Sequence, residues 1–132
     1  MQINGYHHIG LFVTDAELSL KFYTDGLGGK ETFSFPFPAD ASKKIYLVDV
    51  GGGAVIEIVP RGEESPEERA RWAHVCFLTD DVRAAFDKAI AAGAAVRSEP
   101  ADVKLGTMNA TNAFVYGPDG EVIEFFKVNG YN

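Results

Sequence analysis

The chain has 132 residues, 46% of them hydrophobic and 23% charged, which is typical of a single globular domain. Its 12 Lys and Arg against 19 Asp and Glu give a net charge of −7, which argues against a nucleic-acid partner, and its single cysteine excludes an intramolecular disulfide. It has neither an apolar run near the roughly 20 residues of a membrane span nor the basic start of a signal peptide, so we expect a cytoplasmic protein with no membrane partner.

A strand and a helix open the predicted structure. Apolar residues over about residues 6–14 predict a strand. Asp15 follows at a position where its carboxylate would cap a helix, and Leu18 and Phe22 lie four residues apart on one face of that helix. Two closely spaced glycines then predict the end of the helix.

Further strands and a linker complete the first half. Residues 32–42 contain two prolines and predict an irregular or edge strand. Residues 45–50 and 54–59 predict two strands joined by three consecutive glycines. The charged stretch 61–71, in which Ser65 could cap a short helix, predicts an exposed linker.

The second half repeats this order. A strand is followed by a helix that either Asp80 or Asp81 would cap. The apolar stripe of that helix comprises Val82, Ala85, Phe86, Ala89 and Ile90. Residues 100–110 predict a mobile loop, whereas residues 112–116 and 121–128 predict two strands joined by a glycine-rich turn.

An internal repeat organises these elements. His8 and His74, each near the start of a predicted strand, are 66 residues apart, and Glu57 and Glu124, each at the end of a Val-Ile-Glu string, are 67 residues apart. Two His–Glu pairs that recur at nearly one offset predict two copies of one module. We therefore expect one domain over 1–132, with module one at about 1–60, a linker at 61–71 and module two at about 72–132.

Alternation along the strands predicts which way the four repeated side chains point. The apolar residues that alternate with His8 should pack on the helix, so His8 lies on the opposite face, and the same reasoning applies to Glu57, His74 and Glu124. A carboxylate among apolar neighbours is costly unless it is paired or metal-bound. Two imidazoles and two carboxylates form a nitrogen–oxygen ligand set that suits Zn, Ni, Co, Mn or Fe.

Each of these residues also has a more ordinary interpretation. A lone strand histidine is more often a hydrogen-bonded core group, and a lone glutamate is more often salt-bridged or at a strand edge. His7 alternates to the other face and is expected to be structural or exposed. Cys76, on the His74 face, is expected to be a small buried filler. The repeat favours metal ligands, because symmetry-related strands can bring four such side chains to one point.

Several short sequence segments, spread along almost the whole chain, resemble those of a known family. They are the eight residues from His8 to Asp15, Phe22-Tyr23 with Leu27-Gly28, Val55-Ile56-Glu57, His74-Val-Cys-Phe77 and the seven residues from Pro118 to Glu124. These strings resemble the vicinal oxygen chelate superfamily, and within it bacterial glyoxalase I (lactoylglutathione lyase). The resemblance implies an α+β fold of two tandem βαβββ modules whose mixed sheet curls around a metal-binding cup. It also implies a homodimer whose sites draw ligands from both subunits.

The resemblance further implies a ligand set and a reaction. Glyoxalase I uses His, Glu, His and Glu, which here are His8, Glu57, His74 and Glu124, whereas related dioxygenases lack a carboxylate at the position of Glu57. The substrate would be a hemithioacetal of an α-oxoaldehyde or a similar α-hydroxycarbonyl. A divalent metal ion, Zn, Ni or Co before Mn or Fe, would stabilise the enediolate during proton transfer. Glu124 would be the preferred base and Glu57 its counterpart.

Four residues are candidates for substrate binding: Phe12, Arg61, Lys104 and Met108. Where glutathione-dependent members carry an Arg and an Asn, this chain has Phe12 and Arg61, while Lys104 lies where a Lys that contacts the substrate is expected. Met108 lies in the same predicted loop as Lys104. These differences leave open a different thiol, a related epimerase or dioxygenase, and a non-catalytic protein that binds a small molecule.

Overall fold

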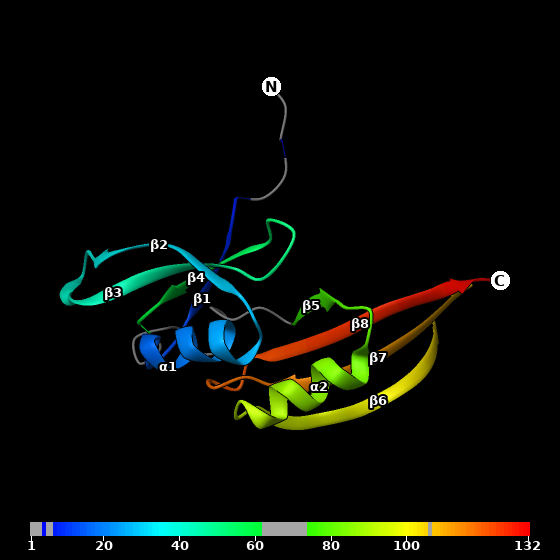
Figure 1. Ribbon diagram of the computed structural model, residues 1–132. Coiled ribbons are helices and arrows are strands. Elements are labelled where there is room, and N and C mark those ends of the chain that lie inside the picture. Colours follow the sequence, from blue (N-terminus) through cyan, green and yellow to red (C-terminus); the bar gives the residue numbers. More distant parts are fainter. Residues whose placement is uncertain (1–3, 5–6, 62–73, 106) are drawn as a thin grey trace. The chain divides into compact units, whose positions relative to one another are not determined.

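The computed structural model describes residue 4 and residues 7–61, 74–105 and 107–132 (Figure 1). The chain divides into two compact units, Met1–Arg71 and Trp72–Asn132. The predicted linker, with the helix expected at Ser65, lies outside the described residues apart from Arg61. Within the described ranges, no helix has the length and apolar character that crossing a membrane requires.

The first unit carries a four-stranded mixed sheet and one helical segment. Its elements are β1 (Ile9–Phe12), α1 (Ala16–Lys21), the π-helical turn η1 (Phe22–Gly26), β2 (Lys30–Phe37), β3 (Asp40–Asp49) and β4 (Val55–Val59). The strand order is β1-β4-β3-β2, with β1 parallel to β4 and the other neighbours antiparallel. β2 is an edge strand whose pairing with β3 is interrupted beside Pro36, as its prolines predicted.

Helix α1 begins where Asp15 predicts, but it buries a different face from the one expected. The Asp15 carboxylate accepts a hydrogen bond from the Leu18 amide at 3.0 Å and so caps the helix. The prediction that Leu18 shares a buried face with Phe22 was wrong, because Leu18 is 54% exposed. The buried residues of this segment are Ala16, Ser19, Phe22 and Tyr23. The buried side of this segment therefore contains every third residue from Ala16, namely Ala16, Ser19 and Phe22, and Leu18 lies outside it.

The sheet of the first unit has one face covered by α1 and one face that carries Glu57. Val48, Ile56 and Ile58 are buried on the helix side. Tyr46, which pairs with Ile58, donates a hydrogen bond from its hydroxyl to the Glu17 carboxylate of α1 at 2.8 Å, so its face is the one that meets the helix. Because successive side chains alternate, Glu57 points to the opposite face.

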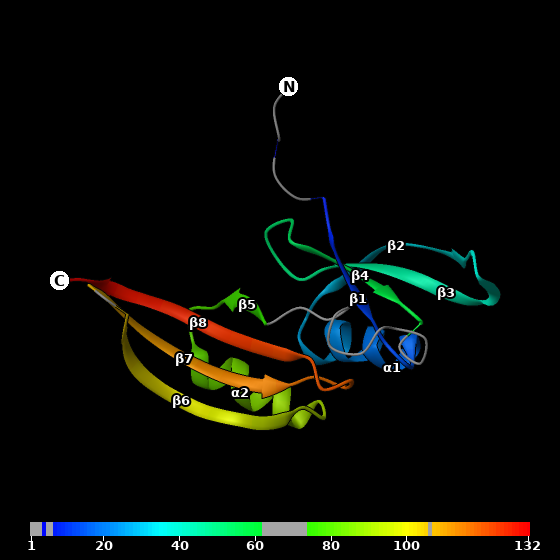
Figure 2. The same ribbon diagram turned by 180° about the vertical axis from the view of Figure 1, so that it is seen from behind.

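The second unit repeats this arrangement element by element (Figure 2). It consists of β5 (Val75–Leu78), α2 (Val82–Ala91), β6 (Ala95–Leu105), β7 (Met108–Tyr116) and β8 (Val122–Tyr131). The order β5-β8-β7-β6, with β5 parallel to β8, matches that of the first sheet. Asp81, the second of the two expected caps, accepts from the Ala84 amide at 2.9 Å. The predicted α+β fold of two tandem βαβββ modules is thus confirmed, and each module has its own four-stranded sheet.

The predicted mobile loop over residues 100–110 was wrong. Apart from the turn residue Thr107, its described residues belong to β6 and β7, which pair antiparallel from Ala95 opposite Tyr116 to Leu105 opposite Met108. The pairing shifts between Ser98 and Ala101, which accommodates Pro100 in an edge strand, where its missing amide hydrogen costs little.

Candidate functional site: two histidine–glutamate pairs

The first unit brings His8 and Glu57 together on the face away from α1. In the parallel pairing of β1 with β4, Gly10 lies opposite Glu57, and His8 is two residues before Gly10 on the same face. The His8 Nε2 atom lies 3.6 Å from Glu57 Oε1. His7 is exposed, and its Nδ1 lies 2.9 Å from His8 Nδ1, so the neighbouring ring helps to orient His8.

The second unit repeats the same pair at the same place in its sheet. Cys76 lies opposite Glu124 in the pairing of β5 with β8, just as Gly10 lies opposite Glu57. The His74 Nε2 atom lies 3.5 Å from Glu124 Oε1. The Glu124 side chain is 10% exposed, whereas that of His74 is 49% exposed. The residue pairing predicted from the repeat is therefore present in each unit separately.

The atoms of each pair fit two ligands of one metal ion. Bonds of about 2.0–2.2 Å to a nitrogen and an oxygen at a tetrahedral angle would place those atoms about 3.4 Å apart. The distances of 3.6 and 3.5 Å in the two units are close to this value. Among the described residues, no group of three or more His, Cys, Asp or Glu comes together. Each unit by itself therefore brings together two of the four residues that the sequence predicts as ligands.

Glu124 has a second polar partner that the sequence interpretation missed. The Asn112 side-chain amide donates a hydrogen bond to Glu124 Oε2 at 3.0 Å, while Oε1 faces His74. Asn112 comes from β7, the strand next to Glu124 in the sheet. The sequence predicted a strand that begins at Asn112, but nothing in the sequence revealed which residue of β8 this side chain meets.

Cys76 differs from its prediction as a buried filler, because the residue is exposed. Burial of its thiol nevertheless raises the pKa of Cys76 to about 11, and the nearby Glu124 carboxylate adds to the shift by repulsion and by hydrogen bonding. The thiol is consequently protonated at neutral pH and is a poor nucleophile and ligand there.

Phe12 and Arg61, both predicted to bind substrate, lie together in the first unit. The Arg61 guanidinium carbon is 5.0 Å from the centre of the Phe12 ring, which is within the range of a cation–π contact. Phe12 also packs against a cluster of buried residues, namely Phe37, Ile45 and Val59. Phe12 shares the open sheet face with His8, so this contact lies beside the first pair.

Lys104 and Met108 do not join the second pair. Lys104 pairs with Asn109 of β7, and Glu124 pairs with Phe114 of the same strand. Asn109 and Phe114 are an odd number of residues apart, so their side chains point to opposite faces of the sheet. Lys104 and Glu124 therefore also lie on opposite faces. Met108 shares the face of Glu124 but lies six residues along β7 from Phe114, at the far end of the strand. The substrate role of both residues stays a prediction.

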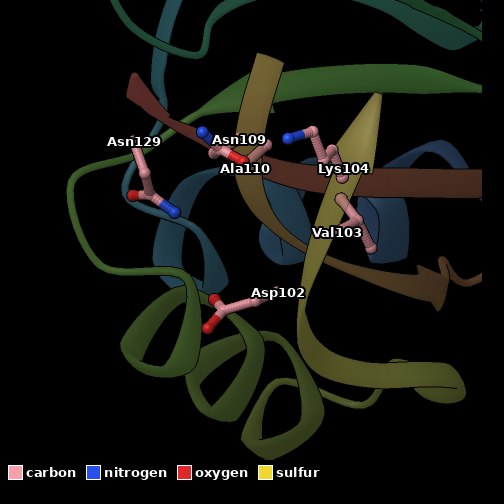
Figure 3. A pocket seen from close by; sticks show the side chains of 6 residues that line it. All are labelled: Asp102, Val103, Lys104, Asn109, Ala110 and Asn129. Atoms are coloured by element: carbon pink, nitrogen blue, oxygen red, sulfur yellow. The ribbon is translucent and has the colours of Figure 1, made fainter. Parts of the chain in front are cut away.

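Lys104 instead lines a pocket of about 370 Å³ (Figure 3). Its lining comprises Asp102, Val103, Lys104, Asn109, Ala110 and Asn129. The acidic group of this lining already has a partner, since the hydroxyl of Thr111 donates to Asp102 at 2.7 Å.

An aromatic row extends from the second pair across the sheet, and the sequence interpretation missed it too. Phe114 meets the His74 ring edge-on, with ring centres 6.2 Å apart. The Arg97 guanidinium carbon lies 5.4 Å from the centre of the Phe114 ring and 6.0 Å from that of Tyr116. In both units, an arginine stacked on an aromatic ring therefore accompanies the His–Glu pair.

Comparisons with known proteins agree with this fold and repeat. Residues 5–125 match the family described as the glyoxalase/bleomycin resistance protein/dioxygenase superfamily. A probable lactoylglutathione lyase of Vibrio cholerae is 33% identical over 91% of this chain and 88% of its own. A lactoylglutathione lyase of Haemophilus influenzae is 32% identical over 91% of this chain and 90% of its own.

Solved structures show the same fold. A glyoxalase/bleomycin resistance protein/dioxygenase from Alicyclobacillus acidocaldarius superposes with a TM-score of 0.70, covering 96% of this chain and 93% of that one at 16% identity. Together with the family match over residues 5–125, this establishes that the chain belongs to the glyoxalase/bleomycin resistance protein/dioxygenase superfamily, the vicinal oxygen chelate fold.

Proposed function

We propose that this protein is a metal-dependent, glyoxalase-like lyase or isomerase. Its substrate would be a hemithioacetal formed from a thiol and an α-oxoaldehyde, or a similar α-hydroxycarbonyl. The observation that carries the proposal is the repeated His–Glu pair, with Nε2–Oε1 distances of 3.6 Å in one unit and 3.5 Å in the other. Relatives named as lactoylglutathione lyases at 33% and 32% identity support it.

The proposed ligands of the metal ion are His8, Glu57, His74 and Glu124. Two imidazole nitrogens and two carboxylate oxygens suit Zn, Ni or Co, with Mn or Fe as further choices. Such an ion supplies Lewis acidity, which stabilises negative charge on substrate oxygens. We further propose that the protein acts as a cytoplasmic homodimer, as the resemblance to glyoxalase I implies.

The two glutamates would move the proton between adjacent substrate carbons. Glu124 is the proposed base and Glu57 its counterpart. The position of Glu124 supports this role, because its side chain is 10% exposed and its Oε1 lies 3.5 Å from His74 Nε2, beside the proposed metal ion. Glu57 is 22% exposed and has the matching position in the other module.

The remaining predicted residues would bind the substrate. Arg61, stacked on Phe12, presents a guanidinium beside the first pair and suits a negatively charged substrate group. Met108, on the face of Glu124, and Lys104, on the opposite face, stay proposed substrate contacts, and Lys104 could act only on a substrate group that reaches its own face of the sheet. The aromatic and aliphatic side chains around the first pair suit the carbon chain of a small thiol adduct.

The test begins with the metal and continues with the reaction. Protein purified with and without chelator is loaded with Ni, Co, Zn or Mn, and metal content and melting temperature are measured. Metal-loaded protein is then assayed with methylglyoxal and a panel of thiols. Turnover with one thiol supports the proposal. Bound metal without turnover with any thiol would point to an epimerase, a dioxygenase or another metalloenzyme of this fold, and no bound metal to a binding protein.

A further inference from the structure

The two carboxylates at the proposed metal site are held differently. Both oxygens of Glu124 have separate partners: Oε1 lies 3.5 Å from His74 Nε2, and Oε2 accepts the Asn112 amide at 3.0 Å. Glu57 has His8 at 3.6 Å, and in the described part of the chain no other side chain hydrogen-bonds to it. The modules are therefore alike in their ligand pairs and unlike in what supports them.

The strand register shows why the first module has no such support. Phe114 lies opposite Glu124 in the second sheet, and Leu47 lies opposite Glu57 in the first. Asn112 precedes Phe114 by two residues on the same face, and the residue two before Leu47 is Ile45. Ile45 is a buried hydrocarbon in the cluster with Phe37 and Val59, so it cannot donate a hydrogen bond to Glu57.

An amide at position 112 needs a polar partner. Asn112 is half-buried and lies opposite Phe126 in the pairing of β7 with β8. A half-buried amide beside aromatic rings is costly unless it is hydrogen-bonded, and Glu124 supplies that bond. A hydrogen bond to a carboxylate is also stronger and more directional than one between neutral groups.

We infer that Asn112 is a positioning residue that fixes the orientation of the Glu124 carboxylate, so that the two glutamates are not equivalent in the reaction. This inference rests on the proposed function. The terminal torsion of a free glutamate is broad, so an unsupported carboxylate samples many orientations. With Oε2 engaged by Asn112, the free electron pairs of Oε1 are directed to the side of His74, where the metal and the migrating proton would be.

The sharpest test replaces the donor without changing the shape of the side chain. Asn112→Asp keeps the volume but replaces the amide N–H with a carboxylate oxygen that repels Glu124, and Asn112→Ala removes the donor without adding charge. Asn109→Asp is the matched control, because this substitution adds the same negative charge to the same strand but on the opposite face of the sheet. Circular dichroism melts verify that each variant folds. If Asn112→Asp does not fold, the comparison is made with Asn112→Ala alone.

Two measurements separate positioning from general structural damage. Co²⁺ titration followed by absorption spectroscopy reports the affinity and ligand geometry, and steady-state kinetics give kcat and KM separately. Loss of a supporting partner of a metal ligand costs about 10–100-fold in metal affinity or activity. We expect both Asn112 variants to weaken Co²⁺ binding and alter its spectrum, with a fall of that size in kcat and little change in KM, while Asn109→Asp matches the wild type.

Two results would overturn the inference in distinguishable ways. If the wild type binds Co²⁺ and turns over substrate, but the Asn112 variants have unchanged spectra, affinities and kcat, then Asn112 does not position Glu124 and the proposed function stands. If the wild type itself neither binds Co²⁺ nor turns over substrate, the proposed function fails and the inference fails with it.

Discussion

Glu57 and Glu124 occupy equivalent strand positions but have different surroundings. Glu124 is the less exposed of the two, at 10% against 22%, and it alone has a side-chain amide partner among the described residues. A carboxylate that must accept a proton benefits from a fixed orientation toward the substrate. The hydrogen bond from Asn112 therefore supports the proposal that Glu124 is the base and Glu57 its counterpart.

Replacing Glu124 should therefore separate catalysis from binding. Glu124→Gln retains the shape and the contact with Asn112 but removes the basic oxygen. We expect turnover to fall by about 10²–10⁴-fold, which is the usual contribution of a general base, while substrate binding persists. Steady-state kinetics and direct substrate titration measure the two effects. Full activity in this variant would exclude Glu124 as the base, and Glu57→Gln, measured in parallel, shows whether its counterpart carries the proton.

At this scale the sequence predicted the ligand pairs but not their supports. Alternation alone determines which face His8 or Glu124 occupies, because it follows from strand geometry. The contact between Asn112 and Glu124 depends on the register in which β7 pairs with β8, and a one-residue shift of that register would abolish it. Cys76 was misjudged for a similar reason, since exposure depends on what covers a face.

Helix starts were the elements most closely predicted from local sequence. Asp15 and Asp81 both cap their helices through the amide three residues on, at 3.0 and 2.9 Å. Only local chemistry is needed for that prediction. The strand over residues 112–116 was predicted and forms the second half of β7, but the end of β6 and the start of β7 were missed. Pro100 and a nearby glycine favour a loop locally, whereas the pairing that forms these strands is a property of the folded sheet.

The cap of α2 gives a direct stability test. Asp81→Ala removes the carboxylate that accepts the Ala84 amide, so we expect the free energy of unfolding to fall by about 1 kcal/mol. Asp80→Ala is the matched control, because Asp80 is an exposed neighbour outside the cap. Urea denaturation of both variants measures the difference. An equal decrease in the free energy of unfolding in the two variants would mean that Asp81 contributes no more to stability than an uncapped surface carboxylate.

The contact between α1 and β3 should make stability depend on alkaline pH. Burial raises the pKa of Tyr46 to about 12 from 10.0, and its hydrogen bond to Glu17 adds to the shift. A group whose pKa is raised on folding stabilises the protein fully below its unfolded value and loses this contribution as pH rises through the folded value. We expect the stability advantage of the wild type over Tyr46→Phe to shrink between about pH 10 and 12. Calorimetric melts across this range measure it, and a constant difference would contradict the assignment.

The repeat was the most informative feature of the whole sequence. It predicted two modules of identical strand order, and the orders β1-β4-β3-β2 and β5-β8-β7-β6 agree with it. It did not reveal which modules combine to complete a site. Each unit holds one proposed nitrogen ligand and one proposed oxygen ligand, whereas protein metal sites usually have four ligands. The proposed metal site therefore requires a first module and a second module, either of the same chain or of a partner.

Mixing inactive variants should show which modules meet. His8→Ala damages the first module and His74→Ala damages the second. If sites form across a homodimer, a mixed dimer of these two variants has one site with all four ligands and one with neither histidine. Random reassociation would then restore about a quarter of wild-type metal content and turnover, since about half of the dimers are mixed and each has one intact site of two.

The control for this experiment pairs two variants damaged in the same module. A mixture of His8→Ala with Glu57→Gln leaves every site of a mixed dimer short of one ligand, so it should restore nothing. We expect recovery after co-refolding of His8→Ala with His74→Ala and none in the control. If neither mixture recovers metal content or turnover, although light scattering confirms dimers, all four ligands of each site lie within one chain. In that case the exchange of subunits cannot restore a missing ligand.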